Sequence, residues 1–373
     1  MEVESQVSSR NEVPKEEKKI NSVLKLSLLV LNCLVLAIGN CGGPLVMRLY
    51  FIHGGTKIWL SSWLETGGWP IMFIPLSISY IYRRCTNDPN GETKVFFITP
   101  YLFMASAGLG LLTGLDDFFY AYGVSHLPIS TTALIQTTHL AFTAGFAFLI
   151  VKQKFTSYSI NSIVLLTVGA VLLGLHGSSD RPNNESNKEY YIGFFMIVAT
   201  AALYGFVLPM VELTCKKAKQ TVTYTLVMEM QLVMSLFSTV FCTIGMLINK
   251  DFQGIAREAK EFGLGKTMYY VVLASSAILW QFFFMGVIGV IFCSSSLLSA
   301  VVAAVLLPFT QILGVLIYHE KFKAEKAIAL FLSLWGFASY LYGEFKGTNK
   351  KKNAAEPKTA TLTPSQTQTL GGI

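Results

Sequence analysis

Ten long apolar stretches constrain the fold of this chain more than any other feature. Most of them reach the roughly 20 residues that a helix needs to cross about 30 Å of hydrocarbon. Their apolar runs are continuous rather than alternating, which disfavours membrane strands. Only 14% of the residues are charged, against about 25% in soluble domains. We therefore predict an all-α polytopic membrane protein with ten transmembrane helices. The segments are Leu24–Met47, Ile58–Tyr82, Pro100–Gly123, Pro128–Val151, Ile160–Leu175, Tyr191–Val211, Tyr224–Ile248, Met268–Phe292, Ser294–Tyr318 and Ala327–Tyr342.

Several motifs recur along the chain at a nearly constant interval. Lys152-Gln153-Lys154-Phe155 closes one apolar segment, and His319-Glu320-Lys321-Phe322 closes another 167 positions later. Further matched pairs are Pro44 with Pro209, 165 apart, and Gly169 with Gly336, 167 apart. The interval predicts two five-helix repeats, residues 24–177 and 191–345, joined by an extracellular linker at 178–190. Because five is odd, the second repeat must enter the membrane in the opposite sense, as in transporters built from inverted halves.

The two ends of the chain differ in composition from its centre. Residues 1–23 and 346–373 are rich in Lys, Glu, Ser, Thr and Gln, and we predict disordered cytoplasmic tails. With the amino terminus inside, 18 of the 29 lysines and arginines fall on the inner side, as the positive-inside rule requires. The sequon Asn184-Glu185-Ser186 then lies outside. The first segment is too long for a removable signal peptide, and no cleavage site follows it.

The remaining composition excludes several classes of protein. The net charge of +7 comes from loops and tails beside the membrane, so it does not indicate nucleic-acid binding. The six cysteines show neither a disulfide framework nor zinc spacing. The five histidines are scattered, so we expect no metal site, no catalytic residues and no cofactor, and the chain is not an enzyme. A receptor is disfavoured because ten segments exceed the usual seven.

Polar groups inside the apolar segments mark the place where function is expected, because burying them in a membrane is costly. The segments hold acids, but no Lys or Arg in their central thirds. A cavity with acids and no cations suits a neutral substrate and is poorly suited to a phosphate. Candidate substrate-binding residues are Asn40, Trp63, Glu65, Asp117, Tyr120, Gln136, Tyr204, Glu229, Gln231, Trp280, Gln281 and Gln311.

Some of these residues share helix faces. Thr113, Asp117 and Tyr120 are spaced by four and three, which aligns them on one side of a helix. A second polar stripe has the same kind of spacing, and hydrogen bonding between packed helices is an equal alternative for it. Its members are Thr132, Gln136, His139 and Thr143.

Three acids are candidates for proton coupling: Glu65, Asp117 and Glu229. A carboxyl group in a dry pocket is more readily protonated than one in water, so it can take up a proton on one side and release it on the other. The alternative is a fixed hydrogen-bond acceptor for substrate N–H groups. Pro44 and Pro209, each near a glycine, are predicted gate hinges.

Five motifs along the chain are specific in combination. They are Gly39-Asn40-Cys41-Gly42-Gly43-Pro44-Leu45, Trp59-Leu60-Ser61-Ser62-Trp63-Leu64, Leu115-Asp116-Asp117-Phe118, Val227-Met228-Glu229-Met230-Gln231-Leu232 and Trp280-Gln281. With these motifs the chain resembles the plant purine permeases of the drug/metabolite transporter superfamily, over about residues 25–346. This resemblance implies ten helices in two inverted halves and proton-coupled import of adenine, related purines and cytokinins by alternating access. It also implies residence in a membrane, for which we expect the plasma membrane.

A nucleotide-sugar or other organic-metabolite transporter of the same fold is the alternative function. Such substrates require buried Lys or Arg, which the segment centres lack. The sequence leaves open the preferred heterocycle, the proton stoichiometry and the oligomeric state, for which a monomer would suffice.

Overall fold

The computed structural model describes residues 15–86, 95–152, 157–175, 186–320 and 322–355. These residues form a bundle of helices, and the described ranges contain no β-strand. Seven helical spans in this part of the chain are long and apolar enough to cross a membrane. They lie at 25–52, 100–126, 129–151, 187–217, 224–248, 266–293 and 296–318. The all-helical, polytopic character expected from the sequence is therefore present.

The elements follow the apolar segments, with some segments divided. They are α1 (Lys15–Ile52), α2 (Ile58–Gly67), the 3-10 turn η1 (Trp69–Met72), α3 (Phe73–Thr86), α4 (Pro100–His126), α5 (Ile129–Gln136), α6 (His139–Val151), α7 (Ser157–Leu175), α8 (Asn187–Lys217), α9 (Tyr224–Ile248), α10 (Asp251–Glu261), α11 (Lys266–Cys293), α12 (Ser296–Tyr318) and α13 (Ala324–Ala355).

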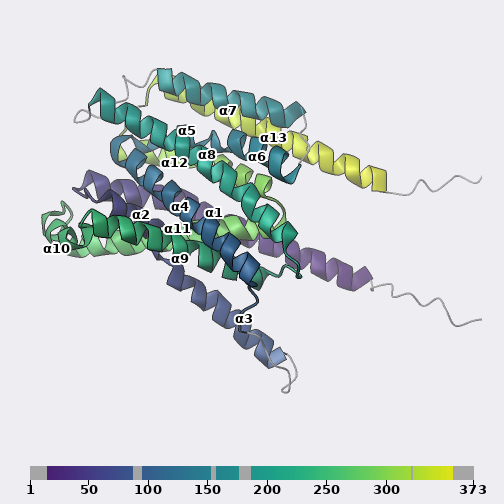
Figure 1. The fold of residues 1–373 in the computed structure, drawn as a ribbon. Coiled ribbons are helices and arrows are strands. Elements are labelled where there is room, and N and C mark those ends of the chain that lie inside the picture. Colours follow the sequence, from purple (N-terminus) through teal and green to yellow (C-terminus); the bar gives the residue numbers. More distant parts are fainter. Residues whose placement is uncertain (1–14, 87–94, 153–156, 176–185, 321, 356–373) are drawn as a thin grey trace, which may run out of the picture.

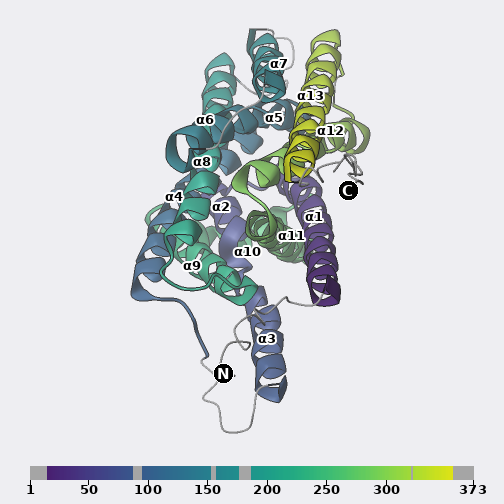
Figure 2. The same ribbon diagram turned by 90° about the vertical axis from the view of Figure 1, so that its right-hand side faces the viewer.

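The helices pack in a pattern that joins distant parts of the sequence. α1 lies against α11, α4 against α8, and α7 against α13. α6 also packs on α8, and α12 on α1. Figure 2 shows α7 and α13 side by side at one edge of the bundle, while α3 extends away at the opposite edge. Every close pair among these therefore joins the first and second predicted repeats.

The second apolar segment is not one helix, which differs from the prediction. Two consecutive glycines, Gly67 and Gly68, end α2, and Pro70 enters the following 3-10 turn. Glycine and proline are the weakest helix formers, so the break falls where the sequence is least able to continue a helix. α3 then leaves the bundle in a new direction (Figure 1).

The tails are helical further than predicted. α1 begins at Lys15 and α13 continues to Ala355, within ranges expected to be disordered. Both additions extend helices that already exist, so no new helix nucleus is required. The start of α1 and the end of α13 lie on the same side of the bundle (Figure 1). The outer parts of the predicted tails, and Asn184 of the sequon, lie outside the described residues.

A short amphipathic helix, α10, occupies a predicted outer loop and was not anticipated. Glu258 on α10 accepts hydrogen bonds from the hydroxyls of Tyr50, Thr56 (3.0 Å) and Tyr269 (3.3 Å). Lys57 lies 3.5 Å from Asp251 at the start of the helix. These contacts attach α10 to the ends of α1 and α11.

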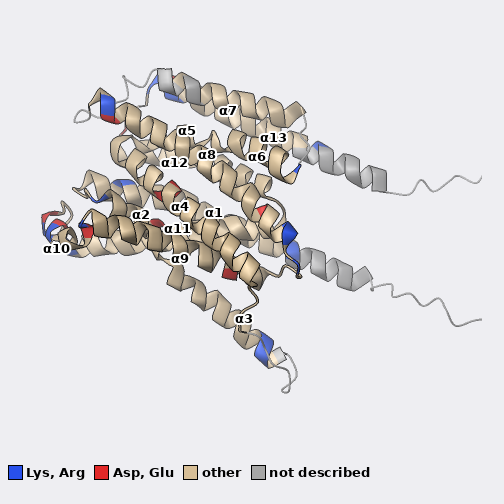
Figure 3. Ribbon diagram, in the orientation of Figure 1, with Lys and Arg blue, Asp and Glu red and all other residues tan. Residues whose placement is uncertain are grey.

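Basic and acidic residues occupy different parts of the helices. In Figure 3 the lysines and arginines lie mostly toward the helix ends, whereas some acidic residues lie on helices in the middle of the bundle. Arg48, near the end of α1, donates to the carbonyl oxygen of Val124 at 2.9 Å. Lys326, near the start of α13, is buried and donates to Ser130 Oγ at 2.6 Å. The centre of the bundle therefore contains acidic residues, and a functional site is expected there.

Candidate functional site

A narrow cavity lies in the middle of the bundle, where helices of both predicted repeats meet. Its free volume is about 50 Å³, which is room for a few water molecules. A two-ring heterocycle needs more space, so the lining side chains must separate to admit one. The lining residues are Asn40 and Pro44 of α1, Glu65 of α2, Asp116, Asp117 and Tyr120 of α4, Gln136, His139, Thr200, Tyr204, Trp280, Phe283, Phe284, Ala303 and Leu307.

The helix spacing on α4 brings acid and aromatic groups to one side, as predicted. Thr113, Asp117 and Tyr120 are all buried, and Asp117 and Tyr120 line the cavity. Asp116, one residue before Asp117, lines the cavity as well. In the sequence it lies inside an apolar segment, within the motif Leu115-Asp116-Asp117-Phe118, but it was not among the predicted site residues.

An interruption in the fourth apolar segment places two more polar side chains at the cavity. α5 ends at Gln136 and α6 begins at His139, with Thr137 and Thr138 between them. The two threonine hydroxyls donate to the carbonyl oxygens of Leu134 (2.6 Å) and Ile135 (2.8 Å), which offers the backbone an alternative to the regular helix ladder. Such breaks are tolerated at membrane depth where the backbone lines a cavity.

His139 is held by its surroundings. Its Nδ1 lies 2.7 Å from the carbonyl oxygen of Gln136, and its Nε2 lies 3.1 Å from that of Ala300. Carbonyl oxygens only accept, so a neutral ring donates to one of these two carbonyls, through whichever nitrogen carries the hydrogen. The four residues of the predicted polar stripe (Thr132, Gln136, His139 and Thr143) do not all face the cavity. Gln136 and His139 line it, whereas the Thr132 hydroxyl donates to the carbonyl oxygen of Pro128.

The three acids at the cavity have different environments. Asp117 Oδ2 accepts from Ser238 Oγ at 2.7 Å, and Ser238 Oγ in turn accepts from Thr66 Oγ1 at 3.0 Å. This chain of hydroxyls ties α4 to α9 and α2, so Asp117 is fixed in place. Glu65 Oε1 and Asp116 Oδ1 are buried with no hydrogen-bond partner in the described part of the chain. These two acids are therefore the ones available to bind something that enters the cavity.

Several buried polar atoms at this cavity have no hydrogen-bond partner among the described residues, as do others elsewhere in the bundle. Buried polar groups in proteins are nearly always hydrogen-bonded, so each exception calls for a reason. Among the described residues, six lining side chains have a buried polar atom without a partner, and both donors and acceptors are represented. These atoms are Glu65 Oε1, Asp116 Oδ1, Gln136 Oε1, Thr200 Oγ1, Tyr204 OH and Trp280 Nε1.

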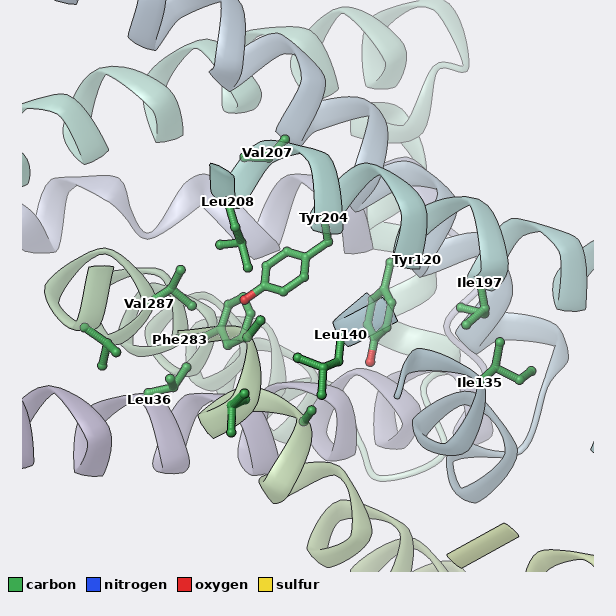
Figure 4. Packing of buried hydrophobic residues seen from close by; sticks show 14 of the residues in the cluster. Leu36, Tyr120, Ile135, Leu140, Ile197, Tyr204, Val207, Leu208, Phe283 and Val287 are labelled. Carbon is green, nitrogen blue, oxygen red and sulfur yellow. The ribbon is translucent and has the colours of Figure 1, made fainter. Parts of the chain in front are cut away.

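Aromatic rings form much of the remaining wall. Trp280 stands edge-on to Tyr120 and to Phe283, at centroid distances of 5.4 and 5.5 Å. Tyr204 lies 5.2 Å from the ring of His139 and 5.9 Å from that of Phe283. In Figure 4 the Tyr204 ring lies between Tyr120 and the side chains of Leu208 and Val287. The cavity therefore offers flat apolar faces together with polar edges.

Seven of the twelve predicted substrate-binding residues meet at this cavity, and five lie elsewhere. Trp63 donates to Thr243 Oγ1 at 3.0 Å and faces a separate apolar groove. Gln231 lines a neighbouring small cavity. Gln281 and Gln311 are fully buried away from the cavity surface. The seven are Asn40, Glu65, Asp117, Tyr120, Gln136, Tyr204 and Trp280.

Glu229, the fifth of these residues, binds backbone outside the cavity. Its Oε2 accepts the amide hydrogens of Phe97 (2.8 Å) and Ile98 (2.9 Å), just ahead of α4. Its partners lie more than 130 residues away in the chain, so the sequence could not reveal them. Of the predicted hinges, Pro44 lines the cavity, while Pro209 lies inside α8 just over one turn beyond Tyr204.

Sequence reasoning missed the apolar and hydroxyl members of the lining. Thr200, Phe283, Phe284, Ala303 and Leu307 look like ordinary packing residues in a membrane helix. Their position one or two turns from a predicted polar residue was the only available signal, as for Phe283 and Trp280.

The fold and the cavity together define the class of protein. A polytopic helical bundle with an acid-lined, cation-free central cavity in its described part is the architecture of an integral membrane transporter. Comparison with known proteins identifies the family. A family model described as purine nucleobase transmembrane transport matches residues 27–351. The chain belongs to this family of purine permeases, which are transporters and not enzymes.

Individual relatives agree with this assignment over most of their length. Purine permease 3 of Arabidopsis thaliana is 53% identical over 326 residues, covering 87% of this chain and 93% of its own. Purine permease 2 of the same plant is 49% identical over 340 residues, covering 88% and 95%. One crystal structure, described only as that of a protein, matches with a TM-score of 0.50 at 14% identity, covering 90% of this chain and 99% of its own. At that identity it shows a shared fold alone.

Proposed function

We propose that this protein is a proton-coupled secondary transporter that imports adenine, related purine nucleobases and heterocycles such as cytokinins. Family membership supports purine nucleobase transport in general. The observation that carries the more specific proposal is the group of six unpaired polar atoms between aromatic rings at the centre of the bundle. A purine is flat, with hydrogen-bond donors and acceptors on its rim. The six atoms include both acceptors for its donors and donors for its acceptors.

The cavity distinguishes the faces of a substrate from its edge. Trp280, Tyr120 and Phe283 supply rings, and stacking of a base on an aromatic ring contributes about 1–3 kcal/mol. Trp280 Nε1 can only donate, whereas Gln136 Oε1 can only accept. A heterocycle lacking the matching groups leaves these atoms buried and unpaired, which costs about 1–3 kcal/mol each.

Proton coupling is assigned to the acids whose oxygens lack a partner among the described residues. An ionised Glu65 or Asp116 accepts substrate N–H groups, and the protonated form offers one donor in place of an acceptor. Binding of a proton and binding of substrate therefore affect one another at the same oxygens. Asp117 already accepts a hydrogen bond from Ser238, so we assign it a structural role that holds the site in place rather than a role in carrying the proton. Glu229 remains a candidate from the sequence, but its carboxylate is engaged by backbone amides.

Transport by alternating access needs two related halves, and the packing supports ten helices in two inverted repeats. α1 packs on α11 as α8 packs on α4, which pairs the first helix of each half with the third of the other. The two echoed motifs also coincide with the same backbone feature, because Lys152 and His319 both end a helix in the left-handed conformation, at φ 56° and 50°. Pro44 and Pro209 are the proposed hinges, and the plasma membrane with cytoplasmic termini is the proposed location.

Adenine uptake by cells expressing single variants tests the coupling. The variants are Glu65→Gln, Asp116→Asn, Asp117→Asn and Glu229→Gln, each assayed at about pH 5.5 and about pH 7.5. We expect Glu65→Gln and Asp116→Asn to lose the acid stimulation of uptake, and Glu229→Gln to keep it. Full uptake and full pH dependence in all four variants would refute proton carriage by these acids.

Competition distinguishes the alternative function. Among the described residues, the cavity lining contains no Lys or Arg, which disfavours nucleotide sugars and sugar phosphates. Unlabelled purine analogues should therefore reduce adenine uptake, and nucleotide sugars should not. The opposite pattern would indicate an organic-anion transporter of the same fold.

A further inference from the structure

A second small cavity adjoins the first and has no assigned role. Its free volume is about 30 Å³, and it lies between α4, α8, α9 and α11. Asp116, Tyr204 and Phe284 line both cavities, so they form the wall between them. The rest of the second lining includes Val207, Val211, Gln231, Met234, Val287 and Ile291.

The two cavities follow one another along the bundle. On α8 the lining advances from Thr200 in the first cavity to Val211 in the second, and on α11 from Trp280 to Ile291. On α4 it moves back from Tyr120 to Thr113. The ends of α8 and α11 and the start of α4 lie on one side of the bundle (Figure 1). The seven residues from Tyr204 to Val211 correspond to about 10 Å along a helix, so the second cavity leads toward that side.

The wall shared by the two cavities contains polar groups that can bind a ligand. Tyr204 OH and Asp116 Oδ1 are both buried without a partner among the residues that the structure describes. Figure 4 places the Tyr204 ring between Tyr120, on the first cavity, and Val287 and Leu208, on the second. Because Tyr204 borders both spaces, a change in its side-chain rotamer would alter the wall between them.

We infer that the second cavity is an inner station for the same planar, uncharged heterocycle, which reaches it by passing between Asp116 and Tyr204. This rests on the proposed transport of purines. The lining suits such a ligand because its described residues are mostly apolar and include the Gln231 amide and the shared acid, with no Lys or Arg. The station lies on the side of Lys216 and Lys217, which the positive-inside rule predicts to face the cytoplasm.

One residue beyond the second cavity on α8, a carboxylate joins two helices. Glu212, next to Val211, accepts the amide hydrogen of Ser296 at 2.8 Å and pairs with Lys216 at 2.7 Å. The carboxylate therefore ties α8 to the start of α12.

The test fills the second cavity after the protein has folded. Val287 lines only the second cavity, and Val287→Cys changes its size little. The purified variant is treated with methanethiosulfonates of increasing size, from methyl to benzyl, and reconstituted in liposomes. The wild-type protein, with its six native cysteines, receives the same treatment and is the matched control. Adenine binding and adenine transport are measured on the same samples.

We expect the benzyl adduct to keep adenine affinity within about 3-fold while transport falls at least about 10-fold relative to treated wild type. Transport by the methyl adduct should lie between that of the benzyl adduct and that of treated wild type. Unchanged transport with the benzyl adduct refutes the inner station alone. Loss of binding in proportion to transport also refutes it, because the second cavity is then not separate from the first. A wild-type protein that neither binds nor transports any purine refutes the proposed function, and the inner station with it.

Discussion

The packing of α1 against Trp280 yields a sharp prediction about substrate affinity. A Cβ added to Gly43 would lie 2.9 Å from Trp280 Cε2 and 3.0 Å from Cδ2. Ordinary van der Waals contact begins at 3.4 Å, so the indole of Gly43→Ala must move by about 0.5 Å. Because Trp280 lines the cavity, this displacement changes the shape of the space that the substrate needs. Overpacking of this kind costs about 1–3 kcal/mol, and we expect adenine affinity to fall about 10-fold, or about 1.4 kcal/mol.

The neighbouring glycine is the matched control. A Cβ on Gly42 would lie 2.9 Å from Leu279 Cδ2, the flexible end of a side chain that does not line the cavity. Both substitutions replace glycine by alanine inside one helix, which favours the helix by a similar amount of about 0.5–1 kcal/mol. We therefore expect Gly42→Ala to bind adenine within about 2-fold of wild type.

The assay is calorimetric titration of adenine into the purified protein in lipid nanodiscs, with uptake measured in parallel. A double-mutant cycle assigns the mechanism: in a Trp280→Phe background the smaller ring should remove most of the effect of Gly43→Ala. Equal affinities for the two alanine variants, or an undiminished effect in the Trp280→Phe background, would show that the indole does not transmit the change.

Three further predictions follow from contacts outside the cavity. Glu229→Ala leaves two backbone amides without their acceptor and should lower the unfolding free energy by about 2–3 kcal/mol; an unchanged melting temperature in detergent would contradict this role. Glu258→Ala removes the acceptor that attaches α10, so protease cleavage within residues 251–261 should accelerate several-fold, whereas exposed Glu261→Ala should not change it. Trp63→Phe loses one hydrogen bond away from the cavity, so adenine affinity should change less than about 2-fold, against at least about 5-fold for Trp280→Leu; similar effects of the two would place Trp63 at the site.

The parts predicted from sequence are those that depend on local spacing. The positions of most helices follow from apolar length, and the shared face of Asp117 and Tyr120 follows from intervals of three and four. The sequence showed that the motifs at Lys152 and His319 recur. Only the structure shows that both residues end a helix in the left-handed conformation.

The parts that escaped prediction depend on which helices become neighbours. Glu229 and Glu65 look alike in the sequence, yet one meets backbone amides and the other faces the cavity. Asp116 and Asp117 are adjacent, and only the position of Ser238 on α9 separates the fixed acid from the available one. The second segment was predicted as one helix, and neither its break after Gly67 nor the new direction of α3 was anticipated, although Gly67 and Gly68 explain the break once it is seen.

Proton-driven purine accumulation through the cavity containing Glu65 and Asp116 is the main proposal for this protein. It is tested by adenine accumulation in proteoliposomes of the purified protein, with an imposed gradient that is acidic outside, for wild type and the paired variant Glu65→Gln/Asp116→Asn. We expect wild type to accumulate adenine above equilibrium only while the gradient lasts, and the variant at most to equilibrate it. Equal accumulation by both proteins, or accumulation by wild type without a gradient, would contradict proton coupling at these acids.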